Sequence, residues 1–285
     1  MREILVTGAT GNVGREVVAG LQAADAQFRI GDRRSAGAKP IANGAVVAFD
    51  FLDPATFRPA VAGCAAVFLL RPPAISDTRD TLNRFIDVAR DVGVDQIVFV
   101  SVAGAGSNPI VPHHAVEQRL RSGPLDWTIL RPGFFAQNLE SAYRGDIRNH
   151  DRIYVPAGRG RVAFIDTQDL AAVAVLALQE PRLHAGQVYT LTGATALSFE
   201  QVAALLSKEL GRTICYEPAG AVDYVRHLIG GEMPLAQALV QTVLHLGLRF
   251  GQAEAVDPTL GHLLGRAPRS MAQYIRDRRS VWEAV

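Results

Sequence analysis

The sequence is poor in the residues that mark several protein classes. Its 285 residues include only two cysteines, Cys64 and Cys215, which are too far apart in the chain to suggest a disulfide framework or a metal cluster. We expect both to be small, buried hydrophobic side chains in a reducing compartment. The 29 Lys and Arg residues nearly balance the 28 Asp and Glu residues. This balance gives no electrostatic reason to expect a nucleic acid or an anionic membrane as a partner.

Long hydrophobic runs are also missing. The longest apolar stretch, Leu170–Leu178, is too short to span a bilayer and is rich in alanine, as packed helices are. A strand-like run is under way by Ile4, which leaves no room for a signal peptide. We therefore expect a cytoplasmic protein without a membrane partner.

Glycine, in contrast, occurs at a regular spacing near the start of the chain. Gly8, Gly11 and Gly14 follow the apolar run Ile4–Val6 at the spacing G-x-x-G-x-x-G, and Arg15–Leu21 then has helical periodicity. A strand, a glycine turn and a helix together present backbone N–H groups to a pyrophosphate. We assign Gly8 to the tight turn, Gly11 to close approach of the phosphate and Gly14 to helix–strand packing. The motif predicts a dinucleotide site.

The first half of the chain alternates strand-like and helical segments, a pattern typical of a parallel sheet with helices on both faces. The expected strands are Glu3–Thr7, Gln27–Gly31, Ala45–Ala48, Ala66–Leu70, Gln96–Ser101 and Trp127–Leu130. The expected helices lie near Asn12–Ala23, Ala55–Val61, Asp77–Val92 and His113–Ser122. We predict an α/β fold with a Rossmann-type, doubly wound parallel sheet.

The second half is less regular and richer in short helical segments. We place a dinucleotide-binding domain at residues 1–155 and a smaller, mostly helical substrate lobe at 156–285, with a strand near 188–191 returning to the sheet. Within the lobe, Tyr224–Leu248 mixes apolar residues with a few polar ones, which suits an apolar pocket and an ordinary core equally well. His227 and His245 lack the spacing of metal ligands, so no metal is expected.

The cofactor residues should follow the strands, because open α/β sheets bind ligands at the carboxyl ends of their strands. Asp32 after the second strand suits the ribose diol of NAD, whereas Arg33 and Arg34 suit the 2′-phosphate of NADP, and this conflict stays open. The other candidates, grouped by the strand that they follow, are Thr10, Asn12 and Val13; Asp50 and Phe51; Leu70 and Arg71; Ser101; and Pro132, Phe134 and Phe135. Phe134 and Phe135 may equally be core residues.

With these residues in view, the chain resembles the NmrA-like branch of the atypical short-chain dehydrogenases/reductases, particularly its triphenylmethane-dye and quinone reductases. The resemblance covers nearly the whole chain. It rests on Thr7–Gly14, Phe99–Ser101, His113-x-x-x-Glu117 and, most distinctively, Thr128–Asn138. It implies a Rossmann-type domain, a small C-terminal substrate lobe and NAD(P)H as the cofactor.

One departure bears on the mechanism. Typical short-chain dehydrogenases carry a Tyr-x-x-x-Lys pair, but the corresponding helix here has His113 and Glu117. We expect His113 to donate a proton or a hydrogen bond, Glu117 to orient its ring and Ser101 to bind the substrate or the nicotinamide amide. The alternatives are a solvent-facing His113 and a Glu117 that pairs with Arg131 or Arg121.

Two functions are compatible with this departure. In the first, the protein is an NAD(P)H-dependent oxidoreductase that delivers hydride to a small apolar or aromatic acceptor, quinone-like or conjugated. In the second, it binds the dinucleotide without turnover and reports redox state to a partner protein, as a sensor of the NmrA type. The sequence leaves the oligomeric state open, with a homodimer as one option.

Overall fold

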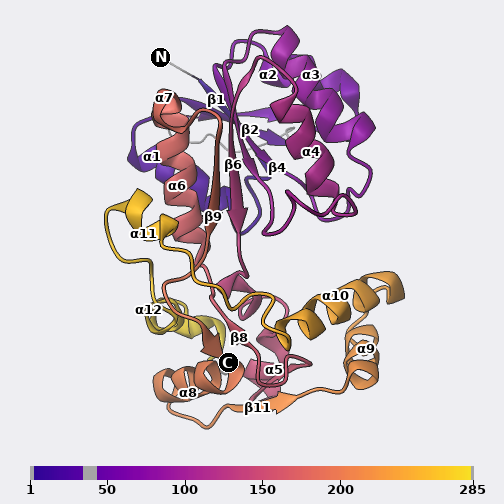
Figure 1. Cartoon of the computed structure of the whole chain (residues 1–285), viewed down its shortest axis with the longest axis vertical. Helices are drawn as coiled ribbons and strands as arrows, with labels where there is room; N and C mark the ends of the chain where they lie inside the picture. The colour runs from indigo at the N-terminus through magenta and orange to yellow at the C-terminus, as the bar shows by residue number, and fades with distance from the viewer. Residues whose placement is uncertain (1–2, 35–43, 284–285) are drawn as a thin grey trace. The chain divides into compact units, whose positions relative to one another are not determined.

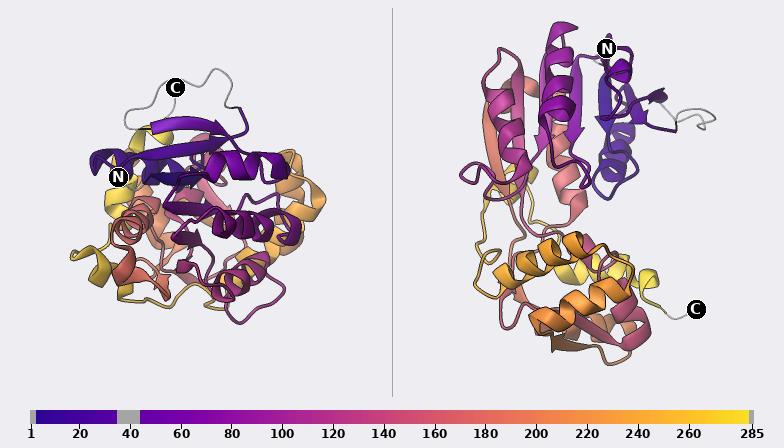
Figure 2. Two further views of the ribbon diagram at one scale, coloured as in Figure 1. Left: turned by 90° about the horizontal axis from the view of Figure 1, so that it is seen from above. Right: turned by 90° about the vertical axis from the view of Figure 1, so that its right-hand side faces the viewer.

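A computed structural model describes residues 3–34 and 44–283, and it divides into two compact units (Figures 1 and 2). Unit 1 comprises Met1–Pro132 and Thr167–Leu191, and unit 2 comprises Gly133–Asp166 and Thr192–Val285. These bounds correct the expected boundary at 155/156. The chain leaves unit 1 directly after the sixth strand of the sheet, returns for one helix–strand segment, and leaves again.

Unit 1 contains a seven-stranded sheet in the order β3-β2-β1-β4-β5-β6-β9, in which all the pairs are parallel. The strands are β1 (Ile4–Thr7), β2 (Phe28–Asp32), β3 (Gly44–Ala48), β4 (Ala66–Leu70), β5 (Gln96–Val100), β6 (Asp126–Pro132) and β9 (Gln187–Leu191). The order reverses between β1 and β4. That reversal is the topological switch point at which doubly wound sheets bind ligands, and the glycine turn begins there.

Helices cover both faces of this sheet (Figure 1). They are α1 (Gly14–Ala23), η1 (Pro54–Thr56), α2 (Phe57–Val61), η2 (Arg79–Asn83, a π-helical turn), α3 (Arg84–Asp91), α4 (Pro112–Arg121), α6 (Thr167–Gln179) and α7 (Pro181–His184). Helices α1 and α6 lie side by side on one face, and α2, α3 and α4 lie on the other. A Cβ atom at Gly20 would lie 2.9 Å from Val175, so the missing side chain lets α1 and α6 pack closely.

Unit 2 is mostly helical and has its own core (Figure 2). Its helices are η3 (Ala136–Asn138), α5 (Arg144–His150), α8 (Phe199–Leu210), α9 (Ala221–Gly230), α10 (Leu235–Leu248), α11 (Thr259–Leu264), α12 (Met271–Asp277) and η4 (Arg279–Val281). Two short strand pairs complete it: β7 (Arg152–Val155) with β11 (Cys215–Pro218), and β8 (Arg161–Val162) with β10 (Leu197–Ser198). Cys64 is buried as expected, but Cys215 at the start of β11 is exposed, which corrects the expectation for that residue. Reciprocal capping boxes at Ser198 and Ser270 start α8 and α12.

Candidate functional site

The turn after β1 is held open by backbone geometry. Gly8 has a φ of +66°, a conformation that glycine adopts without strain, and its carbonyl accepts a hydrogen bond from the Gly11 N–H at 3.0 Å. Thr7 anchors the start of the turn. Its hydroxyl donates to the Phe68 carbonyl at 3.1 Å and accepts from the Leu70 N–H at 2.9 Å, which ties the ends of β1 and β4 together.

The other two glycines differ in the space around them. A Cβ atom at Gly14 would lie 2.1 Å from the Gly8 carbonyl oxygen, so no side chain fits there. A Cβ atom at Gly11 would meet only that same oxygen, at 3.4 Å, so Gly11 faces open space. Val13, at the N-cap position of α1, provides no side-chain cap. An open cradle beside an uncapped helix start fits a pyrophosphate. Thr10 and Asn12 are exposed beside it.

The turn after β2 is shaped by Asp32. One of its carboxylate oxygens accepts a hydrogen bond from the Arg34 N–H at 2.7 Å. Arg33 and Arg34 are exposed, and residues 35–43 lie outside the described part of the chain. The three side chains proposed for the adenosine ribose are thus adjacent, with one Asp32 oxygen already bound within the turn.

The two candidates after β3 have different surroundings. The Asp50 carboxylate accepts from the Leu52 N–H at 3.0 Å and remains half-buried. The Phe51 ring is only 5% exposed and packs edge-on against Phe49 and Phe85. This ring belongs to the aromatic core between the sheet and α2 and α3. The side chain of this cofactor candidate therefore has a structural role, and a contact between Phe51 and the cofactor stays a prediction.

Arg71, after Leu70 at the end of β4, contacts a residue that the sequence did not pair with it. Its Nε donates to Nε2 of His113 at 3.2 Å, and its Nη1 donates to the backbone carbonyls of Pro72, at 3.1 Å, and Ile75. His113 is itself buried, at 8% exposure. The alternative of a solvent-facing His113 is therefore wrong.

Glu117 does not orient the His113 ring. Its carboxylate, only 1% exposed, accepts from the Ser101 hydroxyl at 2.6 Å and from the Arg131 Nε at 2.9 Å, and Arg131 Nη2 also binds it. Burial raises the pKa of Glu117, but the bonds from Arg131 and Ser101 and the charges of Arg131 and Arg121 outweigh it and leave the pKa lowered. The alternative in which Glu117 pairs with arginines is the one observed: Arg131 binds it closely, and Arg121 Nη2 lies 3.7 Å from one of its oxygens. The sequence spacing alone could not choose between this pairing and contact with His113.

His113 is not an imidazolium acid at neutral pH. Burial and, to a smaller extent, the Arg71 charge lower its pKa to about 4, and the Glu117 charge only partly opposes them. The lowered pKa therefore disfavours proton donation by a charged His113 ring near neutral pH. Donation of a hydrogen bond from the neutral ring remains open.

The residues after β6 are divided between the two units. Pro132 is the last residue of β6, is buried and belongs to unit 1. Phe134 and Phe135 belong to unit 2, where the Phe134 ring packs edge-on against Phe164 and His245. The Phe134 side chain thus has the core contacts that the sequence left as an alternative, and its cofactor role stays a proposal.

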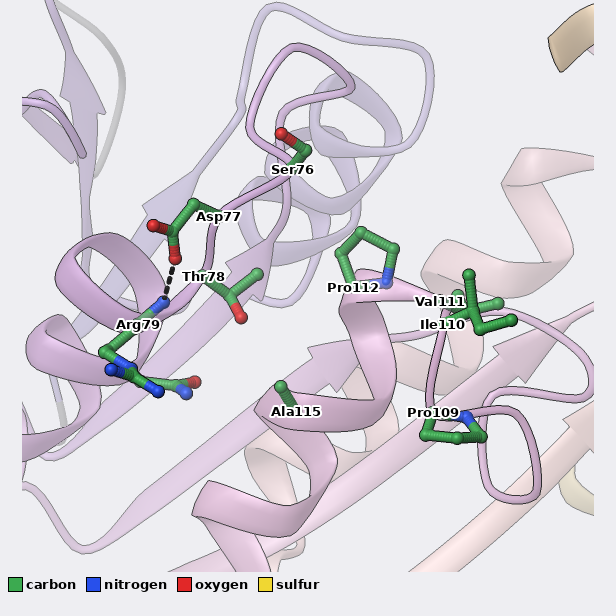
Figure 3. Close-up of a pocket in the computed structure, with 10 residues that line it drawn as sticks. Ser76, Asp77, Thr78, Arg79, Pro109, Ile110, Val111, Pro112 and Ala115 are labelled. Carbon is green, nitrogen blue, oxygen red and sulfur yellow. Dashed lines mark hydrogen bonds between the residues drawn. The ribbon is translucent and has the colours of Figure 1, made fainter.

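A cavity of about 390 Å³ lies beside the start of α4 (Figure 3). Segment 76–79, with the Arg79 N–H donating to the Asp77 carboxylate at 3.0 Å, faces the loop 109–112 across it. Pro112 and Ala115 line the cavity, and His113 lies between them in the sequence. The first turn of α4 therefore has an open side, while the His113 side chain is buried against Arg71.

Two features are absent from residues 3–34 and 44–283. No group of three or more His, Cys, Asp or Glu residues in these ranges could hold a metal ion. No helix in the same ranges is long and apolar enough to cross a bilayer.

The parallel sheet with a glycine turn at its switch point defines a dinucleotide-binding protein of the Rossmann class. More particularly, residues 8–181 match the NAD(P)H-binding family, and the chain belongs to that family. It is 33% identical to an NAD(P)H azoreductase of Xenophilus azovorans, over 99% of this chain and 100% of that protein. The chain is thus an NAD(P)H-dependent oxidoreductase by family.

Solved structures agree with this assignment of fold. An NADPH-dependent quinone oxidoreductase of Escherichia coli, complexed with NADPH, superposes with a TM-score of 0.84 at 25% identity, over 96% of this chain and 99% of that one. NmrA, a negative transcriptional regulator in complex with NADP, has a TM-score of 0.76 at 16% identity, over 97% and 94% of the two chains. The likeness to NmrA shows the shared fold alone.

Proposed function

We propose that this protein is a reductase that transfers hydride from NAD(P)H to a small apolar or aromatic acceptor, quinone-like or conjugated, without a Tyr-x-x-x-Lys pair. The observation that carries the proposal is the cradle at Gly8, Gly11 and Gly14, combined with full-length similarity to an NAD(P)H azoreductase. An acceptor of this kind needs little acid from the protein, because holding donor and acceptor in contact supplies much of the rate.

The chain's own residues would bind and position the cofactor. The open face of Gly11 and the start of α1 hold the diphosphate, and Thr10, Asn12 and Val13 line the same turn. When bound, NAD(P)H supplies a hydride from its nicotinamide ring. A hydrogen-bonded network of Ser101, Glu117 and Arg131 connects the carboxyl ends of β5 and β6 to α4 and holds them in place.

Arg33 and Arg34 favour NADPH over NADH in this proposal. Both guanidinium groups are exposed at the end of β2, where the adenosine ribose of a Rossmann cofactor lies. An arginine can hold a 2′-phosphate through two parallel hydrogen bonds. Asp32 keeps one oxygen in the turn and retains the other for a ribose hydroxyl.

A sensor that binds the dinucleotide without turnover is the competing function. The observation in its favour is that the Ser101 hydroxyl and both Glu117 oxygens are bound within the protein, while His113 is neutral near pH 7. A site with few reactive groups suits a protein that only holds the cofactor.

The test is oxidation of NADPH and NADH by the full chain with benzoquinones, naphthoquinones, azo dyes and cationic triphenylmethane dyes. Turnover of at least one class, faster with NADPH, is the expected result. Tight binding of NADPH with no turnover of any acceptor would favour the sensor. The Gly11→Asp variant is the control, because its side chain would occupy the phosphate space and abolish enzyme-dependent oxidation.

A further inference from the structure

The buried His113 ring has one nitrogen in use and one without a partner. Nε2 receives a hydrogen bond from Arg71 Nε at 3.2 Å. Nδ1 is inaccessible to solvent and has no hydrogen-bond partner in the part of the chain that the structure describes. Buried polar groups are nearly always paired, so an unpaired ring nitrogen in a residue that is 8% exposed needs an explanation.

The Arg71 contact determines where the His113 proton lies. A guanidinium group only donates hydrogen bonds, so the ring nitrogen facing Arg71 must be unprotonated. The neutral ring then carries its proton on Nδ1. The unpartnered atom is therefore a hydrogen-bond donor. Only this tautomer lets His113 Nε2 accept the hydrogen bond from Arg71 Nε.

Arg71 is held in place by its own loop. Its Nη1 donates to the carbonyls of Pro72, at 3.1 Å, Pro73, at 3.3 Å, and Ile75. Bound in this way, the guanidinium group cannot turn away from His113 without losing these bonds. The charged groups that act on the ring are Arg71, which opposes its protonation, and Glu117, which favours it but is bound to Arg131 and Ser101.

We propose that Nδ1–H of neutral His113 donates a hydrogen bond to the acceptor substrate, and that Arg71 is the positioning residue that keeps His113 in this tautomer. The inference rests on the proposed function and names the group that recognises its substrate class. The ligand it predicts has a quinone oxygen or an azo nitrogen that accepts the bond. Because neighbouring groups cover Nδ1, the proposal requires these groups to move aside when the substrate binds to His113. Arg71 acts only through His113.

The electrons and protons of the step balance without an acid in the protein. The acceptor gains a hydride with both its electrons, NAD(P)H is oxidised, and negative charge develops on the acceptor oxygen or nitrogen. The Nδ1–H bond strengthens as that charge grows, which lowers the barrier. The proton that completes the reduction comes from water, and His113 keeps its own.

The tautomer can be read by ¹⁵N NMR of the imidazole rings in the full chain, with His113→Asn used to identify the His113 signals. We expect a protonated Nδ1 and an unprotonated Nε2, unchanged between about pH 5.5 and 8. Arg71→Met should remove this preference and raise the pKa of His113. A proton on Nε2, or a ring that titrates near its ordinary pKa in the unchanged protein, would overturn the assignment.

A matched pair of variants tests the role in turnover. His113→Gln keeps an acceptor for Arg71 and loses the donor near Nδ1, whereas His113→Asn places an amide near Nδ1 and loses the Arg71 contact. We expect kcat to fall roughly tenfold in His113→Gln, as for the loss of one hydrogen bond, and less in His113→Asn. The Kd for NADPH should stay unchanged in both.

The outcomes separate this inference from the proposed function. If the unchanged protein reduces an acceptor but both variants match its kcat, His113 is not the donor. If the loss lies in the Kd for NADPH, the donor serves the cofactor and the assignment to substrate is wrong. If the unchanged protein reduces no acceptor at all, the proposed function itself fails.

Discussion

Two parts of unit 1, the glycine turn after β1 and the start of α4, are held by different interactions. The turn is made by the backbone: Gly8 has a positive φ, Gly14 has no room for a Cβ atom, and Gly11 leaves space for a ligand. The start of α4 is made by side chains: Glu117 is bound by Ser101 and Arg131, and His113 by Arg71.

The difference shows why one part was readable from sequence and the other was not. Glycine spacing constrains the backbone directly, so the residue types alone predict a phosphate cradle. Side-chain pairing depends on which strands and loops the fold brings together. On α4, side-chain pairing also gives two nearby residues different surroundings. Both carboxylate oxygens of Glu117 accept hydrogen bonds, whereas the Nδ1–H of His113 has no acceptor among the described residues.

The largest effect on stability should come from removing the Glu117 carboxylate, which Ser101 and Arg131 bind. Glu117→Leu would leave the Arg131 guanidinium without its buried partner, and we expect unfolding free energy to fall by about 3 to 4 kcal/mol. Urea denaturation measures this loss. Asp87→Leu is the control, since the Asp87 carboxylate is 39% exposed and its ion pairs should contribute less than about 1 kcal/mol. Equal losses would mean that the Glu117 network is no stronger than a surface pair.

The buried His113 ring should make the free energy of unfolding depend on pH. Its pKa of about 4 lies below the unfolded value near 6.5, so the unfolded state binds more protons between these values. Stability is therefore expected to fall by up to about 3 kcal/mol as pH drops from 6.5 to 4. His113→Asn should have a correspondingly smaller fall over the same range in urea titrations. An identical pH slope in that variant would contradict a neutral, buried His113.

The backbone-built turn is tested by adding one methyl group. Gly14→Ala would place a Cβ atom against the Gly8 carbonyl, and we expect a loss of about 2 kcal/mol together with weaker dinucleotide binding. Gly145→Ala is the matched control, because nothing lies within 4 Å of its Cβ position in α5. Thermal unfolding compares the two. If Gly14→Ala were as stable as the control, close helix–strand packing would not depend on Gly14.

The smallest effect is expected at Ser101. Ser101→Ala removes one donor to a carboxylate that Arg131 still binds, which should cost about 1 to 2 kcal/mol. Turnover per folded molecule should fall less than in His113→Gln. A larger kinetic loss at Ser101, measured in the same assay, would transfer the substrate contact from His113 to Ser101.

Much of unit 1 could be predicted from the sequence because its signals are local. Buried strands with β-branched residues, followed by helical stripes such as Leu82, Phe85 and Ile86, are periodic, and the predicted strands agree with the sheet to within a few residues. The expected return of a strand near 188–191 agrees with β9, which pairs with β6. The boundary itself was placed too late, because the chain leaves unit 1 directly after Pro132 rather than near residue 155.

Within the candidate site, the sequence predicted the geometry of the glycine turn better than the partners of the side chains, because glycine spacing constrains the backbone directly. Phe51 after β3 has the same sequence signal as a residue beside a cofactor, but Phe49 and Phe85 enclose its ring. His113 and Glu117 are four residues apart on one helix, which favours contact, yet Arg71 after β4 and Arg131 in β6 bind them separately. The Arg131 pairing was one alternative in the sequence, but local spacing could not select it, and the contact between Arg71 and His113 was not foreseen.

The central claim, that the turn after β1 is a diphosphate cradle, is tested most directly by calorimetric titration of NADPH into the full chain and its Gly11→Asp variant. Gly145→Asp serves as the control for an added carboxylate at an open glycine. We expect tight binding by the unchanged protein and the control, and at least a hundredfold weaker binding by Gly11→Asp, roughly the effect of a carboxylate in the phosphate space. Equal affinity in all three would place the diphosphate elsewhere and contradict the account.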